Sequence, residues 1–526
     1  MNRIPGHLSF DMALQKYKDF KDVSFRGDLS DTLLNDYHPD YILEQTTRLS
    51  TGGNSGDHCV TELASVLQAD SPLDIKSIPT DTEKFVDVLV IGGGGAGCVA
   101  ALSAAENGTD VLIATKLNLG DSNTIMAEGG IQAVVNTEDS IQQHFKDTMQ
   151  SSYYKAEKDL TATMIQHGPE SIKWLIELGM KFDTDENGNL LARKGGGATF
   201  SRVVYFKDYT GLELMRVLRS TLSQSAVSVL NHSPVIELLS DNGRCTGAVL
   251  LDLVTKRIKV IRAKSVVLAT GGSGRIHINN FPTSNHVGAT ADGLSLAYRL
   301  GAKLRELDSF QYHPTGIIYP ESLAGTLVTE GLRSAGARLL NAQGERFVDE
   351  LNSRDIVSAA IIRECENGRG VDVSPGVKGV WLDTPELERN NPGILKKQFP
   401  KLLSLAKNNA INPVEQPVLV YPTLHYQNGG ICINTNGVST VSGLYSTGEV
   451  SGGVHGRNRL MGNALLEVIS LGRITGKQAS MNAKKVDFGD AGVSHLENWR
   501  AEREQFCENN NEIAPKLFPD YFNFKY

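Results

Sequence analysis

Chemically active side chains gather in one short stretch of this chain, residues 443–467, which reads GLYSTGEVSGGVHGRNRLMGNALLE. Among its clustered glycines stand acidic, basic and amide side chains, including Glu449, His455, Arg457, Arg459 and Asn463. Guanidinium groups hold planar anions well, and glycines let a ligand approach the backbone closely. The stretch therefore predicts a binding site for a closely cradled anionic ligand.

A second glycine pattern lies far upstream, where residues 86–116 read VDVLVIGGGGAGCVAALSAAENGTDVLIATK. An apolar strand leads into Gly92, Gly94 and Gly97 at GxGxxG spacing, and an Ala-rich helix follows. Such a turn lets pyrophosphate reach backbone N–H groups at a helix N-terminus, with the three glycines serving the tight turn, the close approach and the helix packing in that order. A second strand, Val111–Ala114, stands at βαβ distance, so the pattern predicts dinucleotide binding.

The identity of the dinucleotide follows from what surrounds this turn. The acid that usually ends the second strand is missing, because Ala114, Thr115 and Lys116 stand there, and this weakens an NAD assignment. Two more strands end in glycines: one lies in SVVLATGGSGR, residues 265–275, and the other in GLYSTGE, whose Glu449 could bond a ribityl chain. Three glycine-terminated strands fit the longer cofactor, FAD, better than NAD.

The chain should hold two or three domains, because 526 residues are too many for one compact core. We predict an α/β fold: a Rossmann-like FAD-binding domain with an inserted capping domain and a short helical C-terminus. The predicted regions are a polar N-terminal extension that wraps the surface (1–84), the first part of the FAD-binding domain (85–309), the capping domain (310–423), the second part of the FAD-binding domain (424–485) and a short C-terminal segment (486–526).

Local patterns predict several elements within these regions. Apolar spacing predicts helices over Thr61–Ala69, Asp159–Leu178 and Ser353–Glu366. Alternating apolar and polar residues around a DNG turn predict a β-meander over Val227–Val267.

Composition excludes other classes of function. The net charge of −8, with acidic and basic residues interspersed, argues against nucleic acid as a partner. The chain has no apolar run near 18 residues and no apolar signal segment at its start, so we expect no membrane span and a cytoplasmic protein. Its six cysteines show no CxxC spacing and predict neither an iron–sulfur nor a zinc site. A redox reaction would then need an electron partner outside the chain.

With these residues in view, positions 86–477 resemble the flavoprotein subunits of succinate dehydrogenase and fumarate reductase, with L-aspartate oxidase a near relative. The resemblance rests on motifs in family order: the glycine turn at Gly92, AEGGIQA (127–133), DYTG (208–211), QYHPTG (311–316), VTEG (328–331), SRDIVS (353–358), PTLHYQNGG (422–430) and HGRNRL (455–460). It implies an enzyme that interconverts fumarate and succinate, or a close dicarboxylate analogue. The segment SGGVHGRNRLMGN looks closer to soluble fumarate reductases than to aspartate oxidases.

The resemblance also implies roles for individual residues. His313, His425 and Arg459 match the carboxylate-binding positions of the family, and Thr329 and Glu330 match the pair that lines its site. Arg354 matches the proton-transfer residue, which needs a relay to restore its proton; Glu330 is the matched candidate, with Glu350 or Asp355 as nearby alternatives. The predicted cofactor contacts are Gly92, Gly94, Gly95, Ala96, Gly97, Thr115, Lys116, Ser122, Asn123, Thr124, Glu128, Gly129, Gly130, Ala269, Thr270, Gly271, Asp292, Glu449, Asn463, Leu465 and Leu466.

Departures from the family pattern affect cofactor and partner. Asn123 stands where respiratory succinate dehydrogenases carry the histidine that bonds to the flavin, which implies non-covalent FAD. Asn428 replaces a methionine and Ser201 a histidine, which leaves the exact dicarboxylate open. Because the C-terminal segment is short for this family, we expect part of the usual docking surface for an iron–sulfur subunit to be missing. We expect such a subunit or another soluble carrier as the electron partner. The expected location is the cytoplasm, either free or at the periphery of a membrane-bound complex.

Two other functions stay open at this point. An L-aspartate oxidase would use the same flavin and arginine core but would need an acid to hold the substrate ammonium group. A flavin-bearing electron-transfer or assembly subunit without catalysis would have no need to keep His313, Arg354, His425 and Arg459 together.

Overall fold

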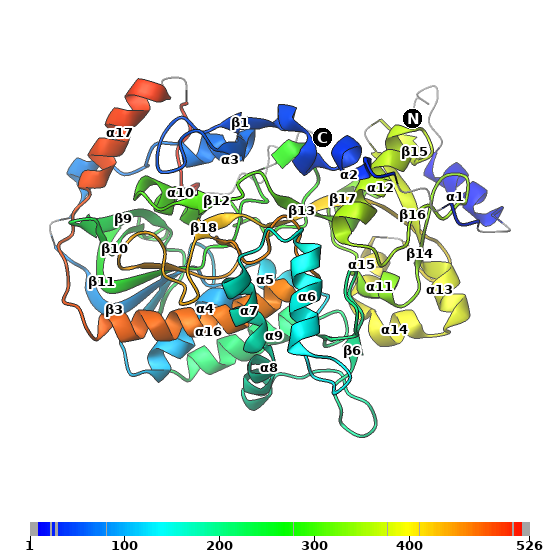
Figure 1. Ribbon diagram of the computed structural model, residues 1–526, viewed down its shortest axis with the longest axis horizontal. Helices are drawn as coiled ribbons and strands as arrows, with labels where there is room; N and C mark the ends of the chain where they lie inside the picture. Colours follow the sequence, from blue (N-terminus) through cyan, green and yellow to red (C-terminus); the bar gives the residue numbers. More distant parts are fainter. Residues whose placement is uncertain are drawn as a thin grey trace.

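A computed structural model describes residues 9–20, 24–26, 30–79, 81–276, 278–375, 377–409, 411–507 and 510–517. Parts of the predicted N-terminal extension and of the C-terminal segment therefore lie outside the described residues. Figure 1 shows a mixed sheet with helices beneath it on one side of the molecule, and a second sheet with its own helices on the other. The fold is the mixed α/β FAD-binding fold predicted from the sequence, with additional sheets that suggest a capping domain.

The main sheet is built on one long strand, β11, which is shared by a parallel and an antiparallel part. Its last residues pair in parallel with β3 on one side and β19 on the other, while its first residues pair in antiparallel fashion with β10. The strand order is β8-β4-β3-β11-β10-β9, with β19 beside β11. The strands are β3 (Lys84–Ile91), β4 (Val111–Ala114), β8 (Ser228–Leu230), β9 (Val235–Asp241), β10 (Arg244–Leu251), β11 (Ile258–Leu268) and β19 (Leu444–Ser446).

The three glycine-terminated strands of the sequence are neighbours in this sheet. β3, β11 and β19 run parallel, so their carboxyl ends meet at one edge. Ligands of open α/β sheets bind outside the carboxyl ends of the strands, which is where the glycines after each strand lie. Two helices, α4 (Gly95–Glu106) and α16 (Asn463–Ala483), pack against one face of this sheet and against each other (Figure 1).

Some predicted elements differ from the structure in their bounds or pairing. The helix predicted over residues 159–178 is two helices, α7 (Lys158–Gln166) and α8 (Gly168–Glu177), because Gly168 and Pro169 interrupt the first and begin the second. The predicted meander holds only for β9, β10 and β11, since β8 pairs in parallel with β4. Helix α12 (Arg354–Glu366) begins one residue after its predicted start.

The second sheet has the order β13-β17-β16-β14, with β15 beside β16. Its apolar core includes Leu332, Phe347, Ile361 and Phe399, all of them buried. The strands are β13 (Phe310–Ile317), β14 (Arg338–Leu340), β15 (Val371–Ser374), β16 (Val377–Asp383) and β17 (Val418–Gln427), and the helices are α11 (Gly331–Ser334), α12, α13 (Thr384–Asn390), α14 (Ile394–Gln398) and α15 (Pro400–Asn408). The predicted domain boundary at residue 423 falls within β17, and the domain limits stay predictions.

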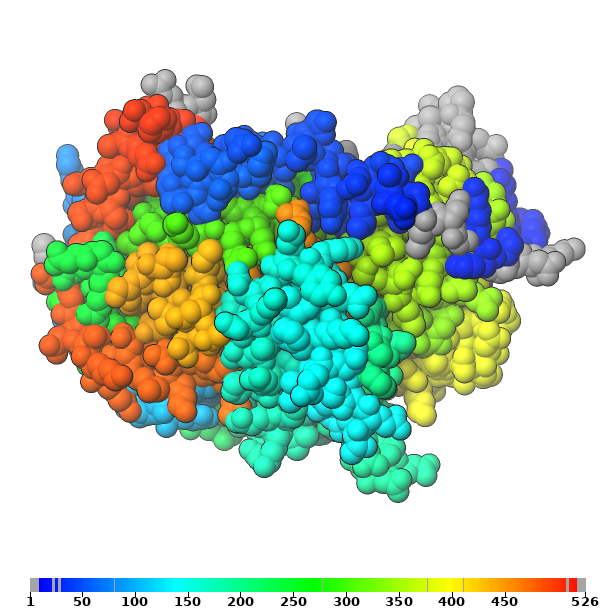
Figure 2. Space-filling model, in the orientation of Figure 1, coloured from blue at the N-terminus to red at the C-terminus, as the bar shows by residue number. Residues whose placement is uncertain are grey.

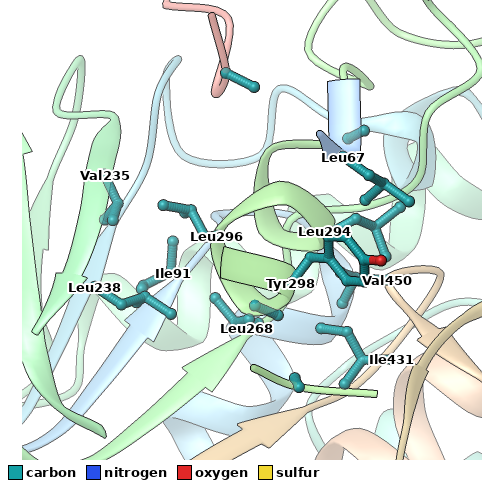
Figure 3. Close-up of a cluster of buried hydrophobic side chains, with 14 of the residues drawn as sticks. Leu67, Ile91, Val235, Leu238, Leu268, Leu294, Leu296, Tyr298, Ile431 and Val450 are labelled. Carbon is teal, nitrogen blue, oxygen red and sulfur yellow. The ribbon is translucent and has the colours of Figure 1, made fainter. Parts of the chain in front are cut away.

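The N-terminal segment crosses the molecule from the second sheet to the first, as the blue surface in Figure 2 shows. Its elements are α1 (Phe10–Lys18), α2 (Leu33–Tyr37), β1 (Thr46–Arg48), β2 (His58–Val60) and α3 (Thr61–Leu67). Helix α3 confirms the predicted helix, and it anchors this segment by packing into the apolar core. Leu63 and Leu67 are fully buried, and Figure 3 shows Leu67 beside Leu294 and Tyr298 of α10 (Asp292–Arg299).

The remaining elements connect these parts. They are α5 (Asn123–Met126), β5 (Ile131–Gln132), α6 (Ile141–Ser151), β6 (Ala192–Arg193), β7 (Val203–Val204), α9 (Thr210–Ser223), β12 (Leu304–Arg305), β18 (Gly430–Cys432), β20 (Ser451–Gly452), α17 (Ser494–Phe506) and the short 3-10 helices Pro39–Tyr41, Leu43–Gln45, Ile75–Ser77, Ile278–Asn280 and Glu321–Leu323. Within the described ranges, no helix is both long and apolar enough to cross a membrane.

Candidate active site

A continuous cavity of about 1610 Å³ joins the glycine turn after β3 to two cationic side chains, Arg354 at the start of α12 and Arg459 in the loop before α16. Most residues predicted for cofactor and substrate line this one cavity. They are Gly92, Gly94, Gly95, Ala96, Thr115, Lys116, Ser122, Asn123, Thr124, Glu128, Gly129, Gly130, Ala269, Thr270, Gly271, Asp292, His313, Thr329, Glu330, Arg354, His425, Glu449, Arg459 and Leu465.

Three residues predicted as cofactor contacts do not line the cavity. Gly97 packs behind the turn, which is the packing role its spacing indicates. The other two, Asn463 and Leu466, lie on faces of α16 that point elsewhere: the Asn463 amide bonds His144 Nε2 at 2.9 Å and Thr148 Oγ1 at 3.0 Å, and Leu466 belongs to the apolar core. In this structure the two side chains serve packing and hydrogen bonding within the protein, and their contact with a cofactor stays a prediction.

The glycine turn has room for nothing larger than glycine. Gly92 has φ +116°, and a Cβ there would lie 2.2 Å from the Ala269 oxygen. A Cβ on Gly97 would lie 1.9 Å from the Gly92 oxygen. Because the turn consists of glycines and carries no side chains, the first N–H groups of α4 face the cavity, as a bound pyrophosphate requires. The cradle fits a dinucleotide.

At the end of strand β4, the polar contacts centre on a lysine, Lys116, where an acid is usual. Lys116 Nζ forms an ion pair with Asp292 Oδ2 at 2.7 Å and donates to Thr290 Oγ1 at 2.8 Å. Thr290 in turn donates to Asp292 Oδ1 at 2.7 Å. An acid does therefore reach this position, but it comes from α10, which explains why inspection of β4 alone finds none.

The middle of the cavity carries Asn123 and Glu449. The Asn123 amide nitrogen donates to Glu449 Oε2 at 3.0 Å and to Asn285 Oδ1 at 2.7 Å, and its oxygen accepts from the His286 backbone N–H at 2.6 Å. Burial raises the pKa of Glu449, and its hydrogen bonds with Gln427 and Asn123 oppose that rise. Ala464 and Leu465, in the first turn of the long helix α16, also line the cavity. The positive end of the helix dipole therefore faces the cavity and favours an anionic group there.

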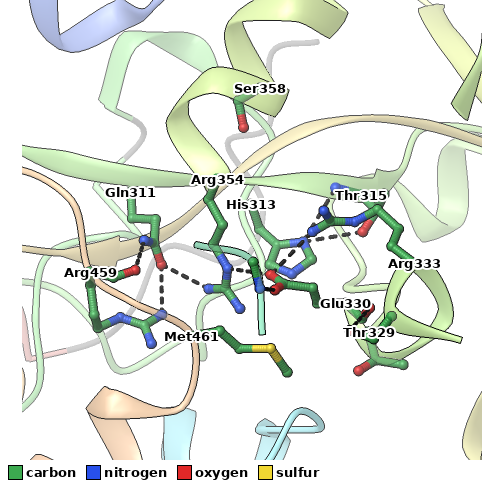
Figure 4. A network of polar contacts seen from close by, with 12 residues as sticks. Gln311, His313, Thr315, Thr329, Glu330, Arg333, Arg354, Ser358, Arg459 and Met461 are labelled. Carbon is green, nitrogen blue, oxygen red and sulfur yellow. Dashed lines mark hydrogen bonds and ion pairs between the residues drawn. The ribbon is translucent and has the colours of Figure 1, made fainter. Parts of the chain in front are cut away.

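At the other end of the cavity, two arginines are held together by one glutamine (Figure 4). Gln311 Oε1 accepts from Arg354 Nη1 at 2.8 Å and from Arg459 Nη2 at 2.7 Å. Gln311 Nε2 donates back to the Arg459 backbone oxygen at 2.6 Å. The Arg459 guanidinium also stacks on the Tyr426 ring at 4.4 Å. Burial and the nearby Arg354 charge lower the pKa of Arg459 to about 10. Two cations are thus fixed side by side facing the cavity, an arrangement suited to a dianion.

The two predicted histidines lie beside these arginines. Their rings meet edge to face, with centroids 5.2 Å apart. His425 Nδ1 lies 2.8 Å from Ser284 Oγ, and His313 Nδ1 lies 3.3 Å from the backbone nitrogen of Thr315. Burial lowers the pKa of both rings well below the usual value, and Arg354 and Arg459 lower it further. Both imidazoles are neutral near pH 7 and can each offer one N–H to a substrate oxygen.

Behind Arg354 stands a carboxylate between two guanidinium groups. Glu330 Oε2 accepts from Arg354 Nε at 2.8 Å and from Arg333 Nη2 at 3.1 Å, and Oε1 accepts from the Gly196 backbone N–H at 2.7 Å. Burial would raise the pKa of Glu330, but the charges of Arg354 and Arg333 outweigh it and hold the pKa at about 2. The result is a continuous row Arg354, Glu330, Arg333 of groups that can exchange protons.

The other two relay candidates have different partners. Glu350 accepts from Arg346 Nη2 at 2.6 Å, and Asp355 accepts from the Tyr153 hydroxyl at 2.5 Å. Gln311 and Arg333 were not predicted as site residues. Gln311 lies inside the quoted QYHPTG motif, and Arg333 follows Glu330 by three residues, which places both on one helical face, so both could have been found.

Two departures from the family pattern do not reach the cavity wall. Asn428 Nδ2 donates to Ser309 Oγ and to the Arg457 backbone oxygen, both at 3.1 Å, and Ser201 is exposed. Neither side chain is therefore positioned to select the substrate. Arg457, from the same HGRNRL motif as Arg459, pairs with Asp308 at 3.0 Å instead of entering the cavity.

Comparisons with known proteins agree with this geometry. Residues 87–465 match the family model described as FAD binding domain. The chain is 34% identical over 421 residues to the fumarate reductase flavoprotein subunit of Haemophilus influenzae (76% of this chain, 69% of that one), and 34% identical over 395 residues to the L-aspartate oxidase of Streptomyces coelicolor (72% and 66%). Among solved structures it resembles a chain of an E. coli quinol fumarate reductase variant, with a TM-score of 0.73, 31% identity and coverage of 81% of this chain and 74% of that one. The chain thus belongs to the FAD-binding oxidoreductase family that includes the fumarate reductase flavoprotein subunits and L-aspartate oxidase.

Proposed function

We propose that this chain interconverts fumarate and succinate, or a close dicarboxylate analogue, with non-covalently bound FAD and with Arg354 as the proton-transfer residue. The observation that carries the proposal is the shared cavity: the dinucleotide cradle at one end opens directly onto Arg354 and Arg459, which Gln311 holds side by side. A cavity of this kind brings a cofactor and a small dianion into contact.

The cations of the site would hold the two carboxylates. Arg459 presents its guanidinium from the Tyr426 face, and the neutral His425 and His313 add N–H donors. The Arg459 charge and these N–H donors, placed at the carboxylates, draw electron density away from the double bond and so favour nucleophilic attack on an alkene carbon. FAD, when bound, supplies the hydride for that attack in the reductive direction.

Arg354 would then deliver a proton to the second alkene carbon. Transfer of one hydride and one proton across the double bond converts fumarate into succinate. Arg354 lies buried beside Glu330, which also bonds Arg333, so a proton that Arg354 gives to the substrate would be replaced along this row. Glu330, ionised at neutral pH, lies 2.8 Å from Arg354 Nε and can pass on a proton from Arg333.

Non-covalent FAD follows from Asn123. Its amide has no nucleophilic ring nitrogen, and it is held by Glu449, Asn285 and the His286 backbone. Acid precipitation of the purified protein should release the yellow flavin into the supernatant. Flavin that remains with the precipitate would overturn this part of the proposal.

The electrons would come from a partner. The H. influenzae relative is named as the flavoprotein component of a fumarate reductase and the E. coli relative as part of a quinol fumarate reductase, so members of the family act with other components. We propose an iron–sulfur subunit or another soluble carrier for this chain, which would place it in the cytoplasm, either free or at the periphery of a membrane-bound complex.

L-aspartate oxidase is the second candidate, because a relative of that name is 34% identical. An ammonium group needs a free acid near the arginines, whereas the Glu330 carboxylate is already bonded to Arg354 and Arg333. A subunit that only transfers electrons would not need the row Arg354, Glu330 and Arg333, and the presence of this row disfavours that function.

One set of assays separates these functions. The purified chain should reduce fumarate with a reduced viologen dye and should oxidise succinate with a dye acceptor, but it should give little turnover with NADH. Rapid formation of peroxide from L-aspartate in air would favour the oxidase instead. Absence of turnover with all three substrates, in protein that retains its flavin, would favour the non-catalytic function.

A further inference from the structure

Met461 occupies a position in the substrate end of the cavity that the reaction itself does not explain. It follows Arg459 by two residues in the loop before α16, it lines the cavity, and it is 2% exposed. In Figure 4 its side chain extends beneath the Arg354 guanidinium toward Thr329. A flexible thioether therefore lies across the space that the carboxylate-binding groups face.

Two glycines leave the room that this side chain fills. A Cβ on Gly129 would lie 2.8 Å from Met461 Cε, and a Cβ on Gly195 would lie 3.2 Å from Met461 Cβ and 3.3 Å from its sulfur. Both glycines belong to strings that border the site, AEGG and KGGG. Methionine normally adapts its shape to its surroundings. Here Gly129 and Gly195 pack against the Met461 side chain from two directions, so fewer rotamers are open to it.

The backbone beneath Met461 is also held in place. Gln132 Nε2 donates to the Met461 backbone oxygen at 2.5 Å. The next residue, Gly462, has φ +83°, and a Cβ there would lie 2.9 Å from the Gln132 nitrogen. The loop cannot move away from the site without breaking these contacts, so the position of the Met461 side chain is set by the same loop that sets Arg459.

We propose that Met461 determines substrate width: it admits an unsubstituted four-carbon dicarboxylate and rejects one with a substituent on its central carbons. The proposal rests on the proposed function, because it assumes that the arginines hold the two carboxylates. Those cations select the length and charge of a substrate, whereas Met461 limits the space beside the carbon atoms between the carboxylates. A single extra methyl group in a tight pocket changes the selectivity by roughly 10–200-fold.

The experiment compares fumarate with methylfumarate. In the wild-type protein, kcat/KM should be much higher for fumarate. In Met461→Ala, which removes Cγ, Sδ and Cε, the ratio of the two kcat/KM values should fall by at least about tenfold, mainly through a gain with methylfumarate. A ratio within about twofold of the wild-type value, in protein with its full complement of FAD, would overturn the proposal.

Other substitutions guard against indirect effects. Met461→Leu conserves most of the volume and should keep the wild-type ratio. Met481→Ala removes a methionine that is 41% exposed on α16 and should also leave the ratio unchanged. If Met461→Ala does not fold, Met461→Val, which retains an apolar wall, should shift the ratio in the same direction by a smaller factor.

Failure of the proposed function would be recognised separately. If the wild-type protein reduces neither substrate, the same variants can be titrated with malonate and methylmalonate while the flavin absorbance is followed. Wild-type protein should then bind malonate more tightly, and Met461→Ala should lose most of that preference. Equal preference in wild type and variant would overturn the role of Met461 even when the reaction differs from the one proposed.

Discussion

The two ends of the cavity are built by opposite means. The cofactor end is made of backbone: Gly92 and Gly97 leave space where any Cβ would lie close to a carbonyl oxygen, at 2.2 and 1.9 Å. The substrate end is made of charged side chains, with Arg354 and Arg459 converging on Gln311 from segments far apart in the chain. We therefore expect the first end to tolerate no added atom and the second end to depend on its charges.

The largest effect should come from an added methyl group at the cofactor end. In Gly92→Ala the new Cβ meets the Ala269 oxygen in a backbone with φ +116°, so the turn cannot form as it stands. We expect purified protein without bound FAD and without activity, measured from the ratio of flavin to protein absorbance. Gly53→Ala is the matched control, because its nearest atoms would lie at 3.7–3.9 Å. A Gly92→Ala protein that retains FAD would show that the cradle is not the cofactor site.

Loss of charge at the other end should spare the cofactor. Arg354→Gln keeps a polar group near Gln311 but removes the proton donor, and general acid catalysis is worth roughly 10²–10⁴ in rate. We expect fumarate reduction to fall by that factor while FAD content and flavin reduction by dithionite are unchanged. Arg457→Gln is the control, because this arginine pairs with Asp308 at 3.0 Å. A fall of less than about tenfold, with the same affinity for fumarate, would remove Arg354 from proton transfer.

Arg459 should show a smaller effect, divided between binding and turnover. Removal of a charge-assisted hydrogen bond in a closed site costs about 1.5–3 kcal/mol. Because about 1.4 kcal/mol corresponds to tenfold, Arg459→Ala should lose on the order of 10–150-fold in kcat/KM and should bind malonate correspondingly less well. Inhibition by malonate at wild-type strength would place the carboxylate elsewhere.

The same contrast decides how much could be predicted from the sequence. The cofactor end is local: strand β4 has its predicted bounds and the turn at Gly92 lies in the predicted place, because apolar spacing and glycines encode them within a few residues. The substrate end is not local, since Arg459 and its partner Gln311 are separated by 148 residues. Their identity could be inferred from motif resemblance, but the contact that joins them could not.

Two residues, Leu466 and Asp292, illustrate what a motif does not carry. Leu465 lines the cavity while Leu466 packs into the core, because successive helical residues point about 100° apart and the motif does not state the phase of α16. Asp292 reaches Lys116 from another helix, so the acid missing from the end of β4 was present in the fold. In both cases the spatial arrangement of elements, and not the local pattern, decided the outcome.

The smallest predicted effect tests a group that stands between the two ends. Glu128 lines the cavity, and its Oε1 forms an ion pair with Lys401 Nζ at 2.8 Å. Lys401 lies in the first turn of α15, where Asp208 Oδ2 accepts from the backbone N–H groups, at 2.9 Å for Lys401 and 3.2 Å for Leu402. These contacts tie the helices of the second sheet to the FAD-binding part beside the cavity.

Burial raises the pKa of Glu128 to about 7, and the Lys401 charge opposes that rise. The ion pair is therefore present above pH 7 and is lost as the pH falls below it. The stability of the fold depends on pH in the opposite direction. Because the pKa of Glu128 in the folded protein, about 7, exceeds the ordinary value of 4.5, proton binding stabilises the folded state. This contribution is complete below about pH 4.5 and is lost as the pH rises to 7. His313 and His425 have pKa values well below the usual range, so they stay neutral through this pH interval.

We expect kcat/KM for fumarate to fall a few-fold on the acid side of a midpoint near pH 7, while the thermal unfolding temperature does not fall with it. Glu128→Gln should remove this acid limb, since its amide does not titrate. Lys401→Met should move the midpoint to higher pH, because the charge that lowers the pKa of Glu128 is gone. An acid limb that persists in Glu128→Gln would assign it to another group. An unshifted midpoint in Lys401→Met would mean that the ion pair at 2.8 Å does not control the ionisation of Glu128.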